Sequence, residues 1–150
     1  MPDYTSRVRT RAPEDDRPAG DEARTLETMD DGLDRAREEA RIRGVGTYEK
    51  HILLCVGPDC CTTEDGLKSW GQLKSGVARL NGSGEAGRIY RTKVGCLRIC
   101  NQGPTAVVYP EGTWYGGMRD EALQRVIVEH LGGGNPVSDF IIGENPLTGD

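Results

Sequence analysis

Five cysteines constrain this 150-residue chain more than any other feature of its sequence. They all lie in the middle third of the chain and are Cys55, Cys60, Cys61, Cys96 and Cys100. An odd number of cysteines in a chain without a secretory signal is a poor basis for a disulfide framework. The N-terminal residues lack the apolar segment of such a signal, so we expect a cytoplasmic location. Metal binding or thiol chemistry is the better interpretation of these cysteines.

The spacing of the cysteines sorts four of them into two close pairs. Four residues (VGPD) separate Cys55 from Cys60, and three residues (LRI) separate Cys96 from Cys100. Each pair lies at the end of a predicted strand and in the loop that follows it, so the two pairs can meet at one end of a sheet. Four thiolates from two such loops can hold a [2Fe–2S] cluster, with two thiolates on each iron.

Other interpretations of these cysteines stay open. Unrelated buried cysteines would pack as small hydrophobic side chains, and a structural zinc site would use the same four thiolates, although zinc loops usually have tighter spacing. A thioredoxin-type thiol site would need C-x-x-C, which the sequence lacks. A Rieske centre would need two histidine ligands. We expect the two histidines, His51 and His130, to be packing residues in a strand and on a helix.

Apolar runs and helical spacing predict the order of elements between residues 48 and 131. The run HILLCV is typical of a buried strand, and Thr62 with Asp65 resembles a capping box before a helical apolar stripe. We predict strands at 51–56, 88–94, 105–109 and 113–115, and helices at 62–80 and 120–131. The order β-α-β-β-β-α predicts an α/β domain with a single sheet and helices packed on it.

The flanks have a different character from this central segment. Residues 1–47 form a charged extension, in which we expect disorder over 1–19 and a helix over about 21–43 with a thin apolar stripe. Residues 132–150 begin with three glycines, and we predict a hinge followed by a flexible tail. The apolar run 140–142 in this tail needs a surface, either on this domain or on a partner.

Charge and composition exclude several classes of protein. The net charge is −5, but residues 48–131 hold ten Lys and Arg against nine Asp and Glu, so the excess acidity lies in the flanks. Basic residues do not gather with aromatic ones as they do on a nucleic-acid surface. No apolar run approaches the length of a membrane span. The sequence offers no catalytic triad, phosphate-binding glycine loop or carboxylate pair, so we do not expect an enzyme.

The segments HILLCVGPDC and TKVGCLRICNQGPTAVVYPEGTWYGG closely resemble the thioredoxin-like [2Fe–2S] ferredoxins. The two cysteine pairs are also similar to those in the small [2Fe–2S] subunit of the flavin module of respiratory NADH dehydrogenase. The resemblance covers about residues 50–131. It implies a thioredoxin-like fold, a [2Fe–2S] cluster near the surface, one-electron transfer between redox protein partners, and a homodimer. Carried over residue by residue, it implies Cys55, Cys60, Cys96 and Cys100 as the ligands.

Cys61 is an extra thiol that the resemblance does not explain. It can replace Cys60 as a ligand or stay unligated, and the spacing from Cys55 favours Cys60. The favoured function is a ferredoxin that shuttles single electrons between a reductase and an acceptor enzyme. The alternatives are a regulatory or structural module with a redox-sensing cluster or a four-cysteine zinc site, and a bound subunit of a larger redox complex. The apolar tail keeps this last alternative open.

Overall fold

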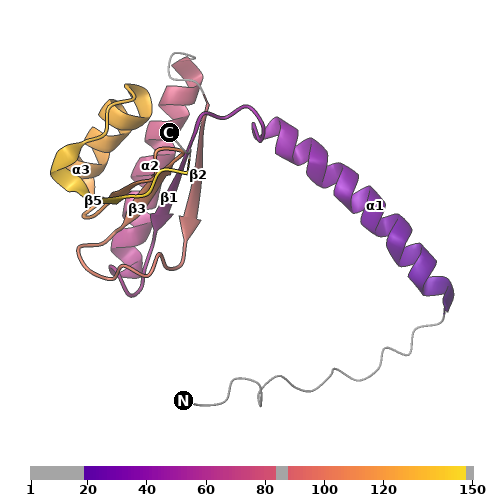
Figure 1. The fold of residues 1–150 in the computed structure, drawn as a ribbon. Helices are drawn as coiled ribbons and strands as arrows, with labels where there is room; N and C mark the ends of the chain where they lie inside the picture. Colours follow the sequence, from indigo (N-terminus) through magenta and orange to yellow (C-terminus); the bar gives the residue numbers. More distant parts are fainter. Residues whose placement is uncertain (1–18, 84–87, 148–150) are drawn as a thin grey trace, which may run out of the picture. The chain divides into compact units, whose positions relative to one another are not determined.

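The computed structural model describes residues 19–83 and 88–147, and the chain divides into two units, Met1–Arg43 and Gly44–Asp150 (Figure 1). In the first unit, α1 (Ala19–Ile42) is the helix predicted over about 21–43. Ion pairs three residues apart, such as Arg37–Asp34 at 2.7 Å, line this helix. Its apolar residues are exposed: Met29 is 55% and Leu33 is 47% exposed. The disorder expected for the first 18 residues lies outside the described part of the chain.

The second unit has the predicted order of strands and helices. Its elements are β1 (Lys50–Cys55), α2 (Thr63–Ser83), β2 (Ile89–Val94), β3 (Ala106–Tyr109), β4 (Thr113–Tyr115) and α3 (Asp120–Arg125), which continues as the π-helix η2 (Val126–Gly132). The hydroxyl of Thr62 accepts a hydrogen bond from the Asp65 N–H at 3.1 Å, as expected for the residue that caps α2. The prediction of an α/β fold with a single sheet is confirmed.

The strands form one sheet in the order β2-β1-β3-β4-β5. β1 and β2 are parallel, with α2 as their crossover, and the other neighbours are antiparallel. In the parallel pair Cys55 lies opposite Val94. The residues that follow β1 and β2 therefore leave the sheet at the same edge, because neighbouring parallel strands end together.

The fifth strand comes from the segment that the sequence suggested as a flexible tail. A 3-10 helix, η3 (Ser138–Phe140), leads into β5 (Ile141–Glu144), which pairs with β4 and extends the sheet. Val137 is buried, and Phe140 and Ile141 pack against the core. Phe140 and Ile141 of the apolar run thus find their surface on this domain, whereas Ile142 is 48% exposed.

The hydrophobic core lies on one face of the sheet, under α2 and the α3–η2 helix. Ile52, Leu54, Ala106, Val108 and Tyr115 point to this face and are buried together with Leu73 and Val77 of α2 and Leu123, Val126, Ile127 and Leu131 of the last helix. A Cβ built on Gly76 of α2 would lie 2.8 Å from Ile127 Cδ1, so the two helices are in close contact at this glycine.

No helix in the described ranges is long and apolar enough to cross a membrane.

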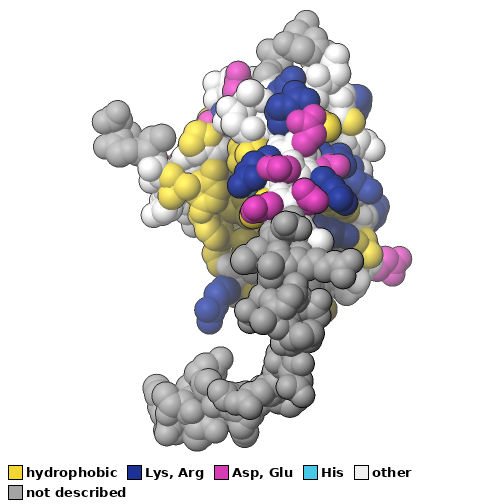
Figure 2. Space-filling model, turned by 90° about the vertical axis from the view of Figure 1, so that its right-hand side faces the viewer, with side chains coloured by type: hydrophobic (Ala, Val, Ile, Leu, Met, Phe, Trp, Pro, Cys, Tyr) yellow, Lys and Arg dark blue, Asp and Glu magenta, His cyan; other side chains and the backbone are white. Residues whose placement is uncertain are grey.

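The surface mixes opposite charges. Figure 2 shows basic and acidic side chains interleaved on the face that it presents, and it also shows a group of hydrophobic side chains. The net charge of the chain is therefore not gathered into a patch of one sign on that face.

Candidate metal centre

The two cysteine pairs follow the two parallel strands at one edge of the sheet. Cys55 is the last residue of β1, and Cys60 lies in the loop that leads to α2. Cys96 and Cys100 lie in the loop between β2 and β3. The Cys55 N–H donates to Thr105 O at 2.8 Å, which ties the end of this second loop to the end of β1. The topology thus places both cysteine pairs that the sequence singled out at the same edge of the sheet.

The sulfur atoms of the first pair are in contact. Cys55 Sγ lies 2.8 Å from Cys60 Sγ, and Cys60 Sγ lies 3.7 Å from Cys61 Sγ. Cys55 is buried, whereas Cys60 and Cys61 are half-buried. Cys60 Sγ is therefore in contact with the sulfur atoms of both Cys55 and Cys61.

The second pair lies at the surface. Cys96 and Cys100 are both exposed, and the Arg98 N–H donates to Cys96 Sγ at 3.2 Å. Arg98 adopts a left-handed backbone conformation with φ of 68°, which turns this N–H toward the sulfur. Hydrogen bonds to ligand sulfurs are among the features that set the potential of an iron–sulfur cluster.

Two glycines let the cysteine loops approach closely. A Cβ built on Gly103 would lie 2.6 Å from the carbonyl carbon and 2.7 Å from the Cβ of Cys60, so the second loop packs directly on the first. Gly57 has φ of 85°, and a Cβ there would meet the Cys61 carbonyl and lie 3.4 Å from Cys61 Sγ. By contrast, a Cβ on Gly95 meets no atom within 4 Å. The close approach of the two loops therefore depends on Gly103, whereas Gly57 allows the first loop to turn tightly on itself.

Burial and neighbouring thiols hold protons on two of these sulfurs. Burial, together with the hydrogen bonds that join Cys60 to Cys55 and Cys61, raises the pKa of Cys60 to about 12. Partial desolvation and then the charges of Cys96, Asp59 and Cys55 raise the pKa of Cys100. A cationic metal centre offsets both effects, because ligand thiols lose their protons on binding. The influence of Cys55 on Cys100 also indicates that the two loops lie close together.

The possible metal ligands at this edge of the sheet are cysteine sulfurs. Within residues 19–83 and 88–147, no three Cys, His, Asp or Glu side chains converge in the way that one metal ion requires. A [2Fe–2S] cluster takes two protein thiolates on each iron, so two separate pairs at one edge are sufficient. All-sulfur ligation also matches the preference of iron–sulfur clusters for soft ligands.

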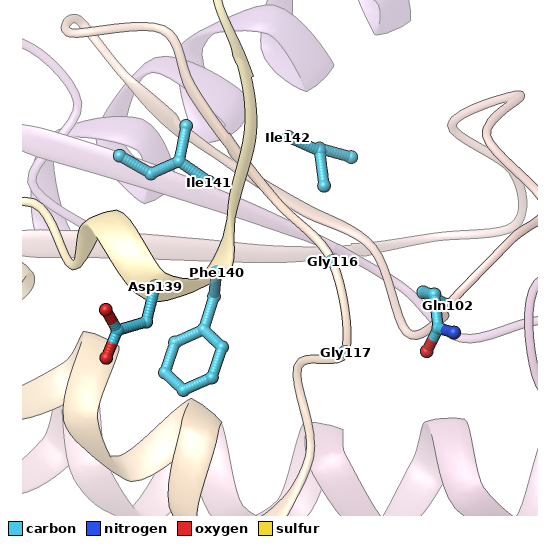
Figure 3. Close-up of a pocket in the computed structure, with 7 residues that line it drawn as sticks. All are labelled: Gln102, Gly116, Gly117, Asp139, Phe140, Ile141 and Ile142. Carbon is cyan, nitrogen blue, oxygen red and sulfur yellow. The ribbon is translucent and has the colours of Figure 1, made fainter.

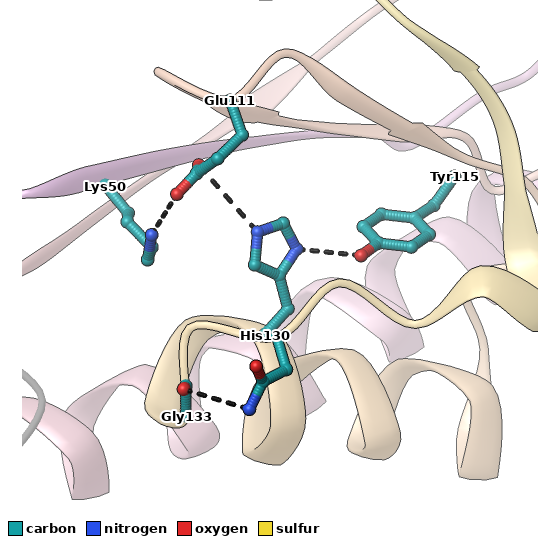
Figure 4. Close-up of polar contacts among 6 residues, drawn as sticks. Lys50, Glu111, Tyr115, His130 and Gly133 are labelled. Atoms are coloured by element: carbon teal, nitrogen blue, oxygen red, sulfur yellow. Dashed lines mark hydrogen bonds and ion pairs between the residues drawn. The ribbon is translucent and has the colours of Figure 1, made fainter.

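The two histidines lie in packed positions. His51 Nε2 is 2.7 Å from the Thr92 hydroxyl, and the ring packs between Tyr48 and Tyr90. His130 is fully buried and contacts the Tyr115 hydroxyl through Nδ1 (Figure 4). Tyr115, the last residue of β4, is also fully buried in the core.

A pocket beside the second cysteine loop was not foreseen from the sequence. It has a volume of about 360 Å³ and is lined by Gln102 of the cysteine loop, by Gly116 and Gly117 after β4, and by residues 139–142 of the tail (Figure 3). No local signal marks this pocket, because its walls come from three separate segments of the chain.

Comparison with known proteins assigns the family. No protein-family model matches the chain. A Priestia megaterium protein named as a 2Fe-2S ferredoxin is 34% identical over 94 residues, which cover 63% of this chain and 70% of that protein. The chain belongs to the [2Fe–2S] ferredoxin family. A 2Fe-2S ferredoxin of Aquifex aeolicus is 40% identical over 58 residues, and this match spans only about half of the relative (52%) and 39% of this chain.

The solved structures extend this ferredoxin relationship to the fold. A thioredoxin-like [2Fe–2S] ferredoxin from Aquifex aeolicus superimposes with a TM-score of 0.56 and 26% sequence identity. The superposition covers 69% of this chain and 98% of that ferredoxin. The thioredoxin-like architecture that the sequence predicted is therefore confirmed.

Proposed function

We propose that this chain is a one-electron carrier that holds a single [2Fe–2S] cluster on Cys55, Cys60, Cys96 and Cys100. The observation that carries the proposal is the convergence of two cysteine pairs at the shared end of β1 and β2. Membership of the ferredoxin family supports the same function, as does the absence of any catalytic constellation in the sequence. The proposed role is electron transfer, not catalysis on a substrate.

When bound, such a cluster accepts and releases one electron, and all-thiolate ligation of plant type corresponds to a potential of about −400 mV. The chain contributes the position of the cluster. Cys55 is buried and anchors the inner side, whereas Cys96 and Cys100 are exposed and keep the outer side close to a partner. The Arg98 N–H on Cys96 Sγ partly offsets the negative charge that an added electron brings.

The proposal keeps the expected partners: a reductase that donates electrons and an enzyme that accepts them, in the cytoplasm. It also keeps a second copy of this chain as a partner. The face of the sheet opposite the core carries half-buried apolar and aromatic side chains at Leu53, Tyr90, Val94 and Trp114, and a second copy can cover such a face. Light scattering of the purified protein measures this oligomeric state directly.

Metal and sulfide analysis after anaerobic purification tests the proposal. We expect two irons and two labile sulfides per chain, and an EPR signal that appears on reduction with dithionite and disappears on reoxidation. One zinc per chain without labile sulfide would replace the carrier by a structural zinc module. A cluster that decomposes on reduction instead of cycling would support the redox-sensing alternative.

A further inference from the structure

A row of polar groups runs through the core on the helix-covered face of the sheet (Figure 4). Lys50 Nζ contacts Glu111 Oε1, and Glu111 Oε2 lies 3.7 Å from His130 Nε2. On the other side of the ring, His130 Nδ1 lies 2.7 Å from the Tyr115 hydroxyl. His130 and Tyr115 are both fully buried. The proposed electron transfer makes no use of these groups.

The Tyr115 hydroxyl connects this row to the C-terminal tail. It accepts a hydrogen bond from the Val137 N–H at 3.0 Å, and Val137 directly precedes η3 and β5. Because the hydroxyl accepts from Val137, its own proton is free to point to His130 Nδ1. That arrangement requires a neutral His130 with its proton on Nε2, facing the Glu111 carboxylate.

A second proton on His130 conflicts with this arrangement. It would sit on Nδ1 and point at the proton of the Tyr115 hydroxyl, which must then turn away. In the described part of the chain, the hydroxyl makes contact with Val137 N–H and His130 and with no second acceptor. His130 Nε2 already lies 3.7 Å from Glu111 Oε2 without a hydrogen bond, so protonation leaves a second buried donor without a partner, which proteins avoid.

The charges around His130 partly cancel one another. Glu111 of the β3–β4 turn favours the imidazolium, but Lys50 of β1 pairs with Glu111 and opposes it. Burial is the largest influence and lowers the pKa of His130. On its own helix, Glu129 is paired with Arg125 at 2.8 Å. Burial is also the largest influence on Tyr115 and raises the pKa of its hydroxyl, and the charges of Glu111, Glu144 and Glu129 raise it further.

We propose that Tyr115 and His130 form an acid-sensitive latch that holds residues 137–144 on the sheet. The latch is closed while His130 is neutral and opens when His130 takes up a proton. Opening frees the β4 edge and removes one wall of the pocket beside the cysteine loop, because residues 139–142 line that pocket (Figure 3). Acidification would thus change the surface that a partner meets next to Cys100.

The size of the effect follows from proton linkage. Once residues 137–144 are released from the sheet, His130 of η2 regains an ordinary pKa of about 6.5. If the closed latch excludes the proton, lowering the pH from 7.5 to 5.5 increases the ratio of open to closed latch by about tenfold. The opening of the latch is confined to residues 137–144. The ring nitrogens of His130 contact Tyr115 and Glu111, which do not belong to α2.

Hydrogen exchange measured by mass spectrometry at both pH values, corrected for intrinsic exchange rates, tests the latch on the full-length protein. We expect the tail amides to be less protected than the α2 amides at both pH values, and to lose about tenfold of their protection at the lower pH. His130→Gln keeps a neutral group at this position and should make tail protection independent of pH. His51→Gln changes the second histidine of the chain and should leave the tenfold difference intact.

A second measurement keeps the test independent of how well the variants fold. NMR of the imidazole nitrogens in the wild-type protein should show the Nε2–H tautomer of His130 at pH 7.5. Equal tail protection at the two pH values, or the Nδ1–H tautomer, would overturn the latch. Tail amides as strongly protected as the α2 amides would also overturn it, because the tail would then open only when the whole domain unfolds. Visible absorbance recorded in parallel shows whether a cluster is lost while the latch opens. A failure of the latch can therefore be distinguished from a failure of the proposed function.

Discussion

The close contact between the two cysteine loops leads to a sharp prediction for Gly103→Ala. The new Cβ would lie 2.6 Å from the Cys60 carbonyl carbon, whereas carbon atoms in contact are about 3.5–4.0 Å apart. The second loop must therefore move away from the first by about 1 Å. A site of this kind tolerates a displacement of only about 0.5 Å before its ligands leave their productive geometry.

We expect Gly103→Ala to lose most of its iron and sulfide. Overpacking against backbone costs about 1–3 kcal/mol, and a domain of this size loses about 4–8 °C in melting temperature for each kcal/mol. Metal analysis and thermal unfolding of the anaerobically purified variant measure both effects.

Gly95→Ala is the matched control, because it lies in the same loop beside Cys96 and its Cβ meets no atom within 4 Å. This variant should keep its full iron and sulfide content and unfold within about 0.5 kcal/mol of the wild type. If Gly103→Ala behaves like Gly95→Ala, the contact between the loops does not support the site, and the reasoning from Gly103 is refuted.

Three further predictions concern the ligands, the core and the tail. Cys60→Ser should abolish cluster binding and Cys61→Ser should not, as measured by iron and sulfide content; the reverse result would assign the ligand role to Cys61. The free energy of unfolding should fall as the pH drops below about 6.5. Burial lowers the pKa of His130 in the folded state, so the unfolded chain binds the proton more readily. Urea titrations at pH 7.5 and 5.5 measure this fall, and they would show no difference if His130 titrated normally. Arg125→Ala removes the ion pair with Asp139 at 2.9 Å and should reduce the hydrogen-exchange protection of β5 at pH 7.5 by a few-fold at most; unchanged protection would mean that this pair does not anchor the tail.

Local patterns in the sequence were sufficient for most of the second unit. The apolar run that ends in Cys55 predicted β1, and the cap at Thr62 predicted the start of α2 within a residue. The position of the cysteines at strand ends predicted their meeting, because a strand-helix-strand unit makes its two strands parallel neighbours. These features depend on short stretches of chain and on one general rule of topology.

Features that depend on distant segments were not predictable. The three apolar residues at 140–142 showed that the tail needed a surface, but not that β4 would supply an edge for β5. His130 fitted the apolar stripe of its helix, and its polar partners Glu111 and Tyr115 lie in the hairpin upstream. The continuation of α3 as a π-helix over Val126–Gly132 has no evident signal in the sequence.

The two cysteine pairs flank the α2–β2 segment in the sequence, and this has a consequence for the folding of the chain. A centre that binds Cys60 and Cys96 closes a loop of 96 − 60 = 36 residues, which contains the whole of α2 and β2. A covalent link across a loop of that size reduces the entropy of the unfolded chain by an amount worth roughly 4 kcal/mol. That is a large share of the roughly 5–15 kcal/mol that keeps a typical domain folded. The metal centre would then be a staple as well as a carrier, and the lifetime of the fold would follow the lifetime of the centre.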